Sequence, residues 1–269
     1  MSSTKSTQES SFKALFAAIV IPVALVVAWV IYKFILGAPG NFDAEGHPVA
    51  GNYLGVIYMG GPIVPILITV NLLVLTFSIE RFITISKAKG SSRVEPFIRN
   101  VKNLMNAGNF DAAMSECDKQ KGSIAAVIKA GLGKYKYVEN DNSMDKEGKI
   151  AAIQKELEEA TSLELPMLSK NLVIISTCAS IATLIGLIGT VLGMIRAFAA
   201  LAQAGAPDAT ALATGISEAL INTALGIIGS TIAIIMYNYF TNKIDTLTYG
   251  IDEAGFSIVQ TFNERHKKA

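Results

Sequence analysis

The chain has 269 residues, of which 51% are hydrophobic and only 17% charged, and its formal net charge is +1. This composition makes a membrane protein the first class to test. A bilayer core about 30 Å thick needs roughly 20 apolar residues in an α-helix. Four stretches of about that length are present, and they exclude a fold that is soluble along its whole length.

The first apolar stretch, residues 14–36, predicts a transmembrane helix. Lys33 lies near its end, where its side chain can reach the membrane interface beside Trp29 and Tyr32. The apolar core is longer than the roughly 7–15 residues of a signal-peptide core. We therefore interpret it as a retained span, preceded by a tail at residues 1–13.

Three further apolar stretches predict spans at residues 62–86, 166–202 and 209–242. The last two are joined by only six residues, 203–208, which predicts an antiparallel helical hairpin. Span 209–242 is interrupted by a single charged side chain, Glu218.

The distribution of Lys and Arg predicts the orientation of these spans. Residues 37–61 and 203–208 contain neither Lys nor Arg, so we expect both segments to face outward. Residues 87–165 begin with a cluster of basic residues, and residues 243–269 end with another. Positive residues mark the cytoplasmic side. Both termini and the segment 87–165 should therefore be cytoplasmic.

The cytoplasmic segment 87–165 is expected to be helical. Apolar residues recur at helical spacing after residue 94 and again after residue 110, and Ser123 can cap a third helix. A polar loop at 138–145 then leads into a highly charged helix. Because strand-like alternation is missing, the predicted fold class is an all-α, polytopic transmembrane protein with four spans and a helical cytoplasmic segment.

Small residues form a stripe along each of the last two predicted spans. Because lipid tails do not drive helices together, small residues usually mark close helix–helix packing. One interpretation is that the stripes only pack the hairpin. The glycines expected at this contact are Gly186, Gly189, Gly193, Gly215, Gly226 and Gly229.

Several polar residues accompany these stripes and are not explained by packing. Glu218 is about nine residues into its span, or roughly 14 Å at 1.5 Å per residue, near the middle of the bilayer. Ionisable residues at that depth face a bundle interior or a water-filled path. Asn222, Thr223 and Thr190 are expected near it. Either these groups form a proton path, or Glu218 is a protonated structural residue and the threonines bond to their own helices.

Other kinds of site are not expected. Cys117 and Cys178 fall in different predicted environments, which argues against a disulfide. The only histidines, His47 and His266, do not suggest a metal site, and no cofactor motif is found. No nucleophile–base pair or phosphate-binding loop can be assembled, so we do not expect an enzyme.

Two long motifs carry a resemblance to a known family. Residues 186–195, Gly-Leu-Ile-Gly-Thr-Val-Leu-Gly-Met-Ile, resemble a span motif of the MotA/TolQ/ExbB proton-channel family. Residues 215–226, followed by Tyr237-Asn238, resemble its next span. Glu80-Arg81-Phe82 resembles the end of its first span. The resemblance covers roughly residues 63–240 and is closest to ExbB and TolQ.

This resemblance implies a homo-oligomer, a pentamer in that family, whose last two spans line a pore. A single-span partner of the ExbD/TolR type would occupy the pore, and proton flow would do work on a TonB-like or TolA-like protein. Thr190, Glu218 and Thr223 match the family's functional positions. Asn222 stands where a small apolar residue is usual, and span 14–36 is extra to the family core.

The resemblance therefore favours a subunit in the bacterial inner membrane that energises TonB-dependent outer-membrane transport. A TolQ-like envelope-integrity motor and a gliding or rotary stator are alternatives. In a third hypothesis the protein is a scaffold in which Glu218 is never deprotonated. The residues alone suit either H⁺ or Na⁺. We expect membrane lipid, and no nucleic acid, as a partner.

Overall fold

The computed structural model describes residues 18–203 and 209–266. Among these residues every regular element is a helix, apart from one antiparallel bridge between Phe42 and Pro48. The predicted all-α fold class is confirmed. The tail predicted at 1–13 and residues 204–208 of the predicted turn lie outside the described residues.

The described residues contain four helical stretches that are long and apolar enough to cross a membrane, which confirms the predicted number of spans. These stretches are Ala18–Leu36, Gly61–Asn106, Lys146–Ala202 and Leu212–Arg265. The protein is therefore a multi-pass membrane protein. By its contacts the chain divides into two units, the first comprising residues up to 78 together with 173–237, and the second comprising 79–172 and 238 onward.

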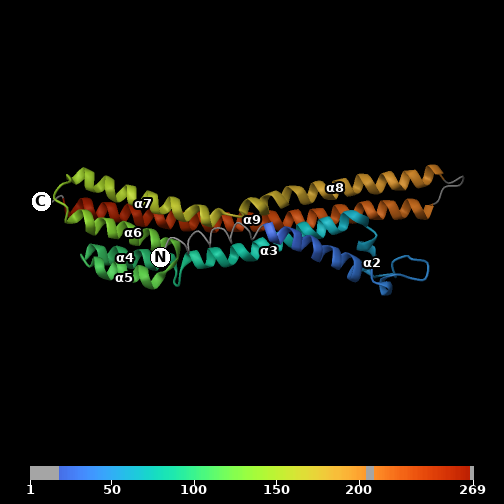
Figure 1. The fold of residues 1–269 in the computed structure, drawn as a ribbon, viewed down its shortest axis with the longest axis horizontal. Coiled ribbons are helices and arrows are strands. Elements are labelled where there is room, and N and C mark those ends of the chain that lie inside the picture. Colours follow the sequence, from blue (N-terminus) through green and yellow to red (C-terminus); the bar gives the residue numbers. More distant parts are fainter. Residues whose placement is uncertain (1–17, 204–208, 267–269) are drawn as a thin grey trace. The chain divides into compact units, whose positions relative to one another are not determined.

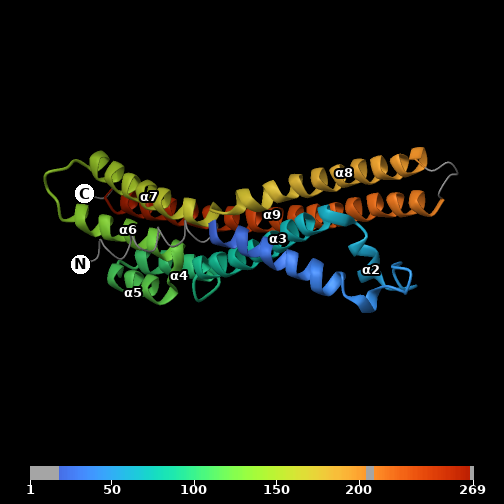
Figure 2. The same ribbon diagram turned by 45° about the vertical axis from the view of Figure 1, so that its right-hand side comes forward.

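The first unit holds the apolar helices. Helix 18–30 continues into a π-helical segment η1 (Ile31–Leu36), and short elements η2 (Pro39–Asn41), α2 (Tyr53–Tyr58) and η3 (Gly61–Ile63) lead into α3 (Val64–Lys89). Helix α8 (Leu172–Gln203) lies antiparallel beside the first part of α9 (Ala209–Arg265), as Figures 1 and 2 show. The predicted hairpin is thus present.

The connection between the first helix and α3 is held by two asparagines. The buried Asn41 donates from Nδ2 to the carbonyl oxygens of Ile35 and Leu36, both at 2.8 Å. Asn52 donates to Oδ1 of Asn41 at 2.9 Å and caps α2 by accepting from the backbone N–H of Leu54. These bonds satisfy the last carbonyls of the first helix, which would otherwise lack partners. The predicted outer loop 37–61 therefore has a defined structure.

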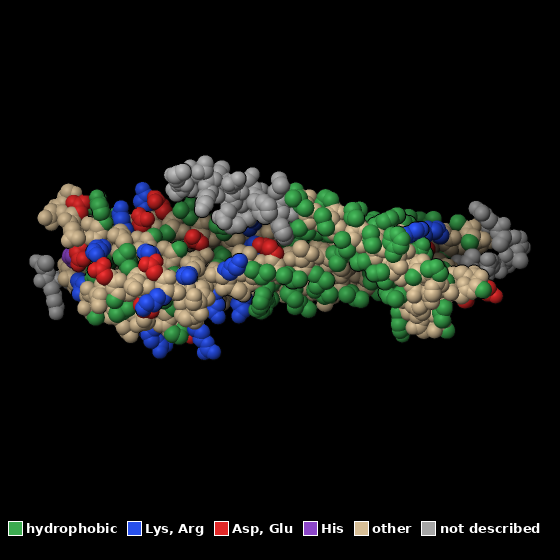
Figure 3. Space-filling model, turned by 60° about the horizontal axis from the view of Figure 1, so that its bottom comes forward, with side chains coloured by type: hydrophobic (Ala, Val, Ile, Leu, Met, Phe, Trp, Pro, Cys, Tyr) green, Lys and Arg blue, Asp and Glu red, His purple; other side chains and the backbone are tan. Residues whose placement is uncertain are grey.

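The second unit contains four helices between the ends of α3 and α9: α4 (Val94–Asn106), α5 (Phe110–Gln120), α6 (Gly122–Glu139) and α7 (Lys146–Ser169). They agree with the helices expected between residues 94 and 164. Helix α6 begins one residue before Ser123, which is therefore not its cap. On the face shown in Figure 3, charged side chains gather over the second unit, whereas hydrophobic ones cover much of the first.

Helix α9 does not end with the predicted span but continues to Arg265. An aromatic cluster anchors its last turns within the second unit. The ring of Tyr135 lies 4.4 Å from that of Phe110 and 4.9 Å from that of Phe262, and His266 stacks on Phe262 at 4.2 Å. Aromatic pairs at these separations contribute about 0.5–1.5 kcal/mol beyond their burial. Most of the segment predicted as a C-terminal tail, 243–269, is therefore packed helix.

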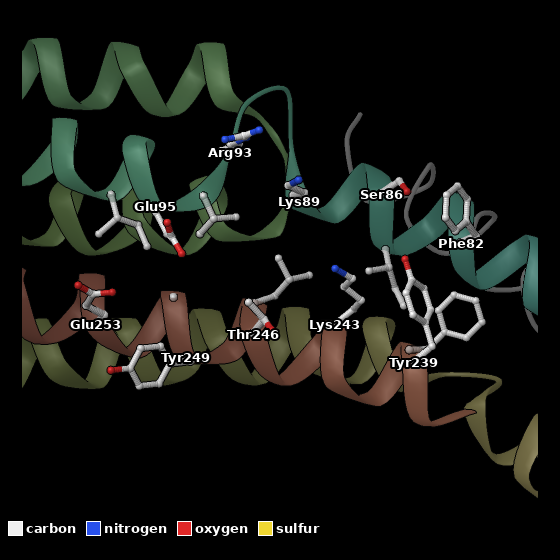
Figure 4. Close-up of a pocket in the computed structure, with 16 residues that line it drawn as sticks. Phe82, Ser86, Lys89, Arg93, Glu95, Tyr239, Lys243, Thr246, Tyr249 and Glu253 are labelled. Carbon is white, nitrogen blue, oxygen red and sulfur yellow. The ribbon is translucent and has the colours of Figure 1, made fainter. Parts of the chain in front are cut away.

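A groove of about 470 Å³ lies in the second unit where α3 ends. Lys89 on α3 and Lys243 on α9 border it, with the aromatic rings of Phe82 and Tyr239 at one end (Figure 4). Each lysine follows closely on a predicted span, because those spans end at residues 86 and 242. A lysine from just beyond each of two predicted spans therefore borders the same groove. Such a cluster of positive charge is typical of the cytoplasmic boundary of a membrane.

Candidate functional site

The site is built around Glu218, on the part of α9 that pairs with α8. Glu218 is only 6% exposed. Its Oε1 accepts a hydrogen bond from Nη1 of Arg196, which projects from α8. The Arg196 side chain is 46% exposed, so one member of this ion pair is buried and the other reaches the surface of the chain.

The start of η3, just before α3, approaches the ion pair through its backbone rather than its side chains. Gly61 has φ +73°, a left-handed conformation that favours glycine. A Cβ at this position would lie 2.5 Å from Oε1 of Glu218 and 3.2 Å from Nη1 of Arg196. Gly61 therefore lets the chain pass directly against both charged groups.

Asn222, one turn along α9 from Glu218, contacts the same segment. It is fully buried, and its Nδ2 donates to the carbonyl oxygen of Gly60 at 2.8 Å. Among the described residues, nothing donates to its Oδ1. A buried oxygen without a donor is costly, by about 1–3 kcal/mol. Asn222 thus ties α9 to the start of η3, and its Oδ1 is left without a donor among the described residues.

Thr190 and Thr223 pair with each other across the hairpin. Their hydroxyl oxygens are 3.1 Å apart. Thr190 also contacts its own helix, at 3.2 Å from the carbonyl oxygen of Gly186 and 2.9 Å from that of Leu187. Thr190 therefore bonds to a carbonyl of its own helix, which was one of the two possibilities considered from the sequence. Its contact with Thr223 also joins α8 to α9.

Two tyrosines from outside the hairpin complete the surroundings of the site. The rings of Tyr32 and Tyr58 stack at 4.6 Å, and the Tyr32 hydroxyl donates to the Tyr58 carbonyl oxygen at 3.3 Å. Tyr32 lies within electrostatic range of both Glu218 and Arg196. The first helix therefore contributes a polar group to this region.

The glycines of the two stripes lie where helices approach closely. A Cβ on Gly189 would lie 2.4 Å from Cβ of Asn222, and one on Gly226 would lie 2.6 Å from the carbonyl oxygen of Ala182. Gly186, Gly193 and Gly215 likewise face the opposite helix of the hairpin. Gly229 differs, because its nearest neighbour is the side chain of Asn71 on α3. That these six glycines stabilise the contacts between the helices stays a prediction.

The structure brings the four predicted site residues into the hairpin and adds one that the sequence analysis missed. Glu218 and Asn222 face the start of η3, and Thr190 and Thr223 pair with each other. Among the described residues, the hydrogen-bond partner of Glu218 is Arg196 rather than a threonine. The signal for Arg196 was available, since it is the only charged residue in α8, and a charge inside a span needs a partner.

A comparison with protein families now bears on this hairpin. Residues 119–253 match the model of the MotA/TolQ/ExbB proton channel family. The chain belongs to this family. The matched stretch includes Thr190, Arg196, Glu218 and both long motifs, and the resemblance drawn from the sequence is confirmed.

Individual relatives within this proton channel family are similar at modest identity. The Tol-Pal system protein TolQ of Pseudomonas aeruginosa is 29% identical over 138 residues, 51% of this chain and 59% of TolQ. The biopolymer transport protein ExbB of Pseudomonas putida is 27% identical over 146 residues, 54% of this chain and 44% of ExbB. TolQ of Haemophilus influenzae is 29% identical over 127 residues, 46% of this chain and 56% of the relative. The chain spans about half the length of these curated relatives.

The family assignment fits the chemistry of the site. Glu218 carries an ionisable carboxyl group, and the described residues contain no group of three His, Cys, Asp or Glu that could hold a metal ion. The names of the relatives refer to a Tol-Pal system and to biopolymer transport. Gly60, Gly61, Tyr32 and Tyr58 lie outside the matched residues, so part of the surroundings of Glu218 belongs to the stretch that the family model does not cover.

Proposed function

We propose that this chain is a proton-channel subunit of the bacterial inner membrane, with both termini in the cytoplasm. It converts the proton-motive force into mechanical work through a single-span partner of the ExbD/TolR type. The work energises TonB-dependent transport across the outer membrane. One observation carries the proposal: a buried carboxylate, Glu218, lies inside the apolar hairpin that the family model matches.

The physical case rests on where the acid is found. Ionisable side chains inside transmembrane spans are rare and costly even on permissive scales, so such a group usually has a function. A proton that crosses the membrane releases about 2.3 kcal/mol per 100 mV. Proton binding at Glu218 would neutralise the carboxylate and remove the charge attraction to Arg196. Thr190, Thr223 and Asn222 would provide the neighbouring polar groups of the path.

The surface of the hairpin supports an assembly with further chains. In the single chain, large apolar side chains of α8 remain exposed: Leu184, Leu187, Ile188, Val191, Ile195 and Phe198. Exposed apolar side chains on a membrane helix must meet lipid or other helices. In the proposed pentamer, α8 and the first part of α9 face the pore and contact neighbouring copies and the partner helix.

A TolQ-like motor for envelope integrity is the second candidate, because TolQ relatives match at an identity similar to that of ExbB. The two candidates differ in their partner. Co-purification in mild detergent, followed by mass spectrometry, should recover an ExbD-like single-span protein with a TonB-like one if the first candidate is correct. Recovery of TolR-like and TolA-like proteins would favour the second.

The central test is Glu218→Gln. Glutamine preserves the size of the side chain and its hydrogen bonding but cannot carry a proton. The variant should assemble, and proton flux into proteoliposomes should fall to background. Glu147→Gln, an exposed position in the first turn of α7, serves as control and should behave as wild type. Full proton-dependent activity in assembled Glu218→Gln protein would refute the proposed function.

A further inference from the structure

We propose that Arg196 is a positioning residue for proton transfer, acting through Glu218. Its guanidinium holds the carboxylate ionised against Gly61, and releases it when a proton binds. This inference rests on the proposed function and adds to it the group that controls the protonation of the acid.

The first argument is the unequal burial of the pair. The Glu218 side chain is 8% exposed and that of Arg196 is 46% exposed. A buried carboxylate needs a charged partner, whereas the half-exposed arginine has room in the single chain to move its charged end away from the acid while its aliphatic part stays in place. Arg196 is also seven residues from the end of α8, close to the predicted outer surface. The movable member of the pair is therefore the arginine.

The second argument is the set of charges around Glu218. In the described part of the first unit, the other charged side chains are Lys33, Asp43 and Glu45, none of which has an ion pair with Glu218. Tyr32, Tyr58 and Asn222 are neutral polar neighbours from the first helix, α2 and α9. Arg196 is thus the group whose charge stabilises the ionised acid. Removal of an opposite charge favours the protonated form of a carboxyl group.

The third argument is geometric. Gly61 and Asn222 restrict where the carboxylate can go, because the backbone of Gly61 lies against Oε1 and Asn222 is tied to Gly60. When a proton binds to the carboxylate, the ion pair becomes a neutral acid beside a free guanidinium. Release of that proton on the other side restores the pair. In each cycle Arg196 thus forms and then loses its ion pair with Glu218. Arg196 lies on α8, as do the exposed Val191, Ile195 and Phe198.

The test measures proton flux against pH in proteoliposomes that contain the full chain with its co-purified partner. Arg196→Gln should move the half-maximal pH of flux upward by about one unit or more, because a carboxylate without a neighbouring cation retains its proton. Arg196→Lys keeps the charge and should preserve most of the wild-type profile. Arg99→Gln, an exposed arginine of α4, is the matched control and should change nothing.

The double variant separates a positioning role from a structural one. Glu218→Gln leaves Arg196 without its counter-ion, so the oligomer should unfold at a lower temperature than wild type. Adding Arg196→Gln should restore that temperature, while flux stays at background as in Glu218→Gln alone.

An unchanged pH profile in Arg196→Gln, with Glu218→Gln inactive, would overturn this inference and leave the proposed function intact. A Glu218→Gln protein with full flux would instead refute the proposed function itself. If Arg196→Gln does not assemble, Arg196→Lys provides the test, because lysine retains the positive charge. If its pH profile of flux is displaced as far as we expect for glutamine, the charge does not have the proposed role.

Discussion

Gly61 controls how closely the start of η3 approaches Glu218. Its φ is +73°, so any side chain at this position would strain the backbone. An added Cβ would also lie only 2.5 Å from Oε1 of Glu218 and would push the carboxylate away. Left-handed geometry alone costs a residue with a Cβ about 1–2 kcal/mol. Gly61→Ala should therefore lower both the unfolding temperature and proton flux.

Gly133→Ala provides the control for this prediction. A Cβ at Gly133, in the middle of α6, would meet nothing within 4 Å. Alanine favours an α-helix over glycine by up to about 1 kcal/mol, so this variant should be as stable as wild type or more stable. Thermal unfolding in detergent and flux in proteoliposomes measure both variants. Wild-type behaviour of Gly61→Ala would show that the contact with Glu218 is not needed.

Cys117 gives a pH-dependent prediction in the second unit. Burial raises the pKa of its thiol from an ordinary value of 9.0 to about 12. Only the thiolate reacts with alkylating reagents. In a Cys178→Ala background, the folded protein at pH 8 should therefore resist iodoacetamide, whereas the unfolded protein should react. Rapid alkylation of folded protein would contradict the burial of Cys117.

The same thiol affects stability at alkaline pH. Below pH 9 both states keep the proton, and the stabilisation is complete. Between pH 9 and about 12 the unfolded chain loses its proton while the folded chain retains it, so the free energy of unfolding falls as pH rises. Cys117→Ala should show a weaker decline across this window when unfolding is followed by circular dichroism.

The sequence predicted the acid of the site but not its partner. Glu218 was found because a lone charge in an apolar helix is conspicuous, and Thr190, Thr223 and Asn222 followed from helical spacing and from the family motifs. The contact between Arg196 and Glu218 joins two helices at a separation of 22 residues, and spacing within one helix cannot predict such a register. Gly60 and Gly61 were missed as contacts for the same reason, since they come from a third helix.

Arg81 fixes the break between α7 and α8. It is 2% exposed, and its Nη1 donates to the carbonyl oxygens of Met167 at 3.2 Å and Leu168 at 2.9 Å. These carbonyls belong to the last turn of α7 and would otherwise lack partners. Glu80 accepts from Nε of Arg81 at 2.6 Å and from Nδ2 of Asn171 at 3.3 Å. Arg81 thus caps one helix while it pairs with its own neighbour.

Removal of Arg81 should be strongly destabilising. Loss of one member of a buried ion pair typically costs about 3–5 kcal/mol, because the other charge loses its counter-ion. Arg81→Ala should therefore lower the unfolding temperature markedly and expose the α7–α8 junction to protease. Arg99→Ala, which removes an exposed arginine, should do neither. Equal behaviour of the two variants would exclude a capping role for Arg81.

At the scale of elements, hydropathy predicted the number of spans, which is confirmed, but it did not show how far α9 continues. The last span was predicted to end at residue 242 because charged residues begin there. Across this point, however, buried apolar residues continue at intervals of three and four: Phe240, Ile244, Leu247, Ile251, Ala254, Ile258 and Phe262. This stripe buries one face of α9 while charged residues occupy the other, so charge density marks the end of a span but not of a helix.

For the molecule as a whole, the orientation in the membrane is the main prediction that geometry cannot supply. The predicted orientation is based on the distribution of Lys and Arg among the segments. The position of Lys89 and Lys243 at one groove agrees with it, because each lysine follows the end of a predicted span. With both termini inside, the segment 37–61 must face outward and the segment 87–165 must face the cytoplasm. Single cysteines in these two segments can therefore test the orientation directly.

The labelling experiment needs a background without native cysteines, Cys117→Ala/Cys178→Ala, so that neither buried thiol contributes. Ala50→Cys and Asn142→Cys are both at exposed positions in short turns, so local burial does not bias the comparison. In whole cells with a permeable outer membrane, an impermeant maleimide should label residue 50 and not residue 142, and detergent should make both reactive. Labelling of residue 142 alone would invert the topology. Labelling of both residues without detergent would mean that the two segments lie on the same side of the membrane. Residues 62–86 would then not cross the bilayer, and the proposed four-span topology would be wrong.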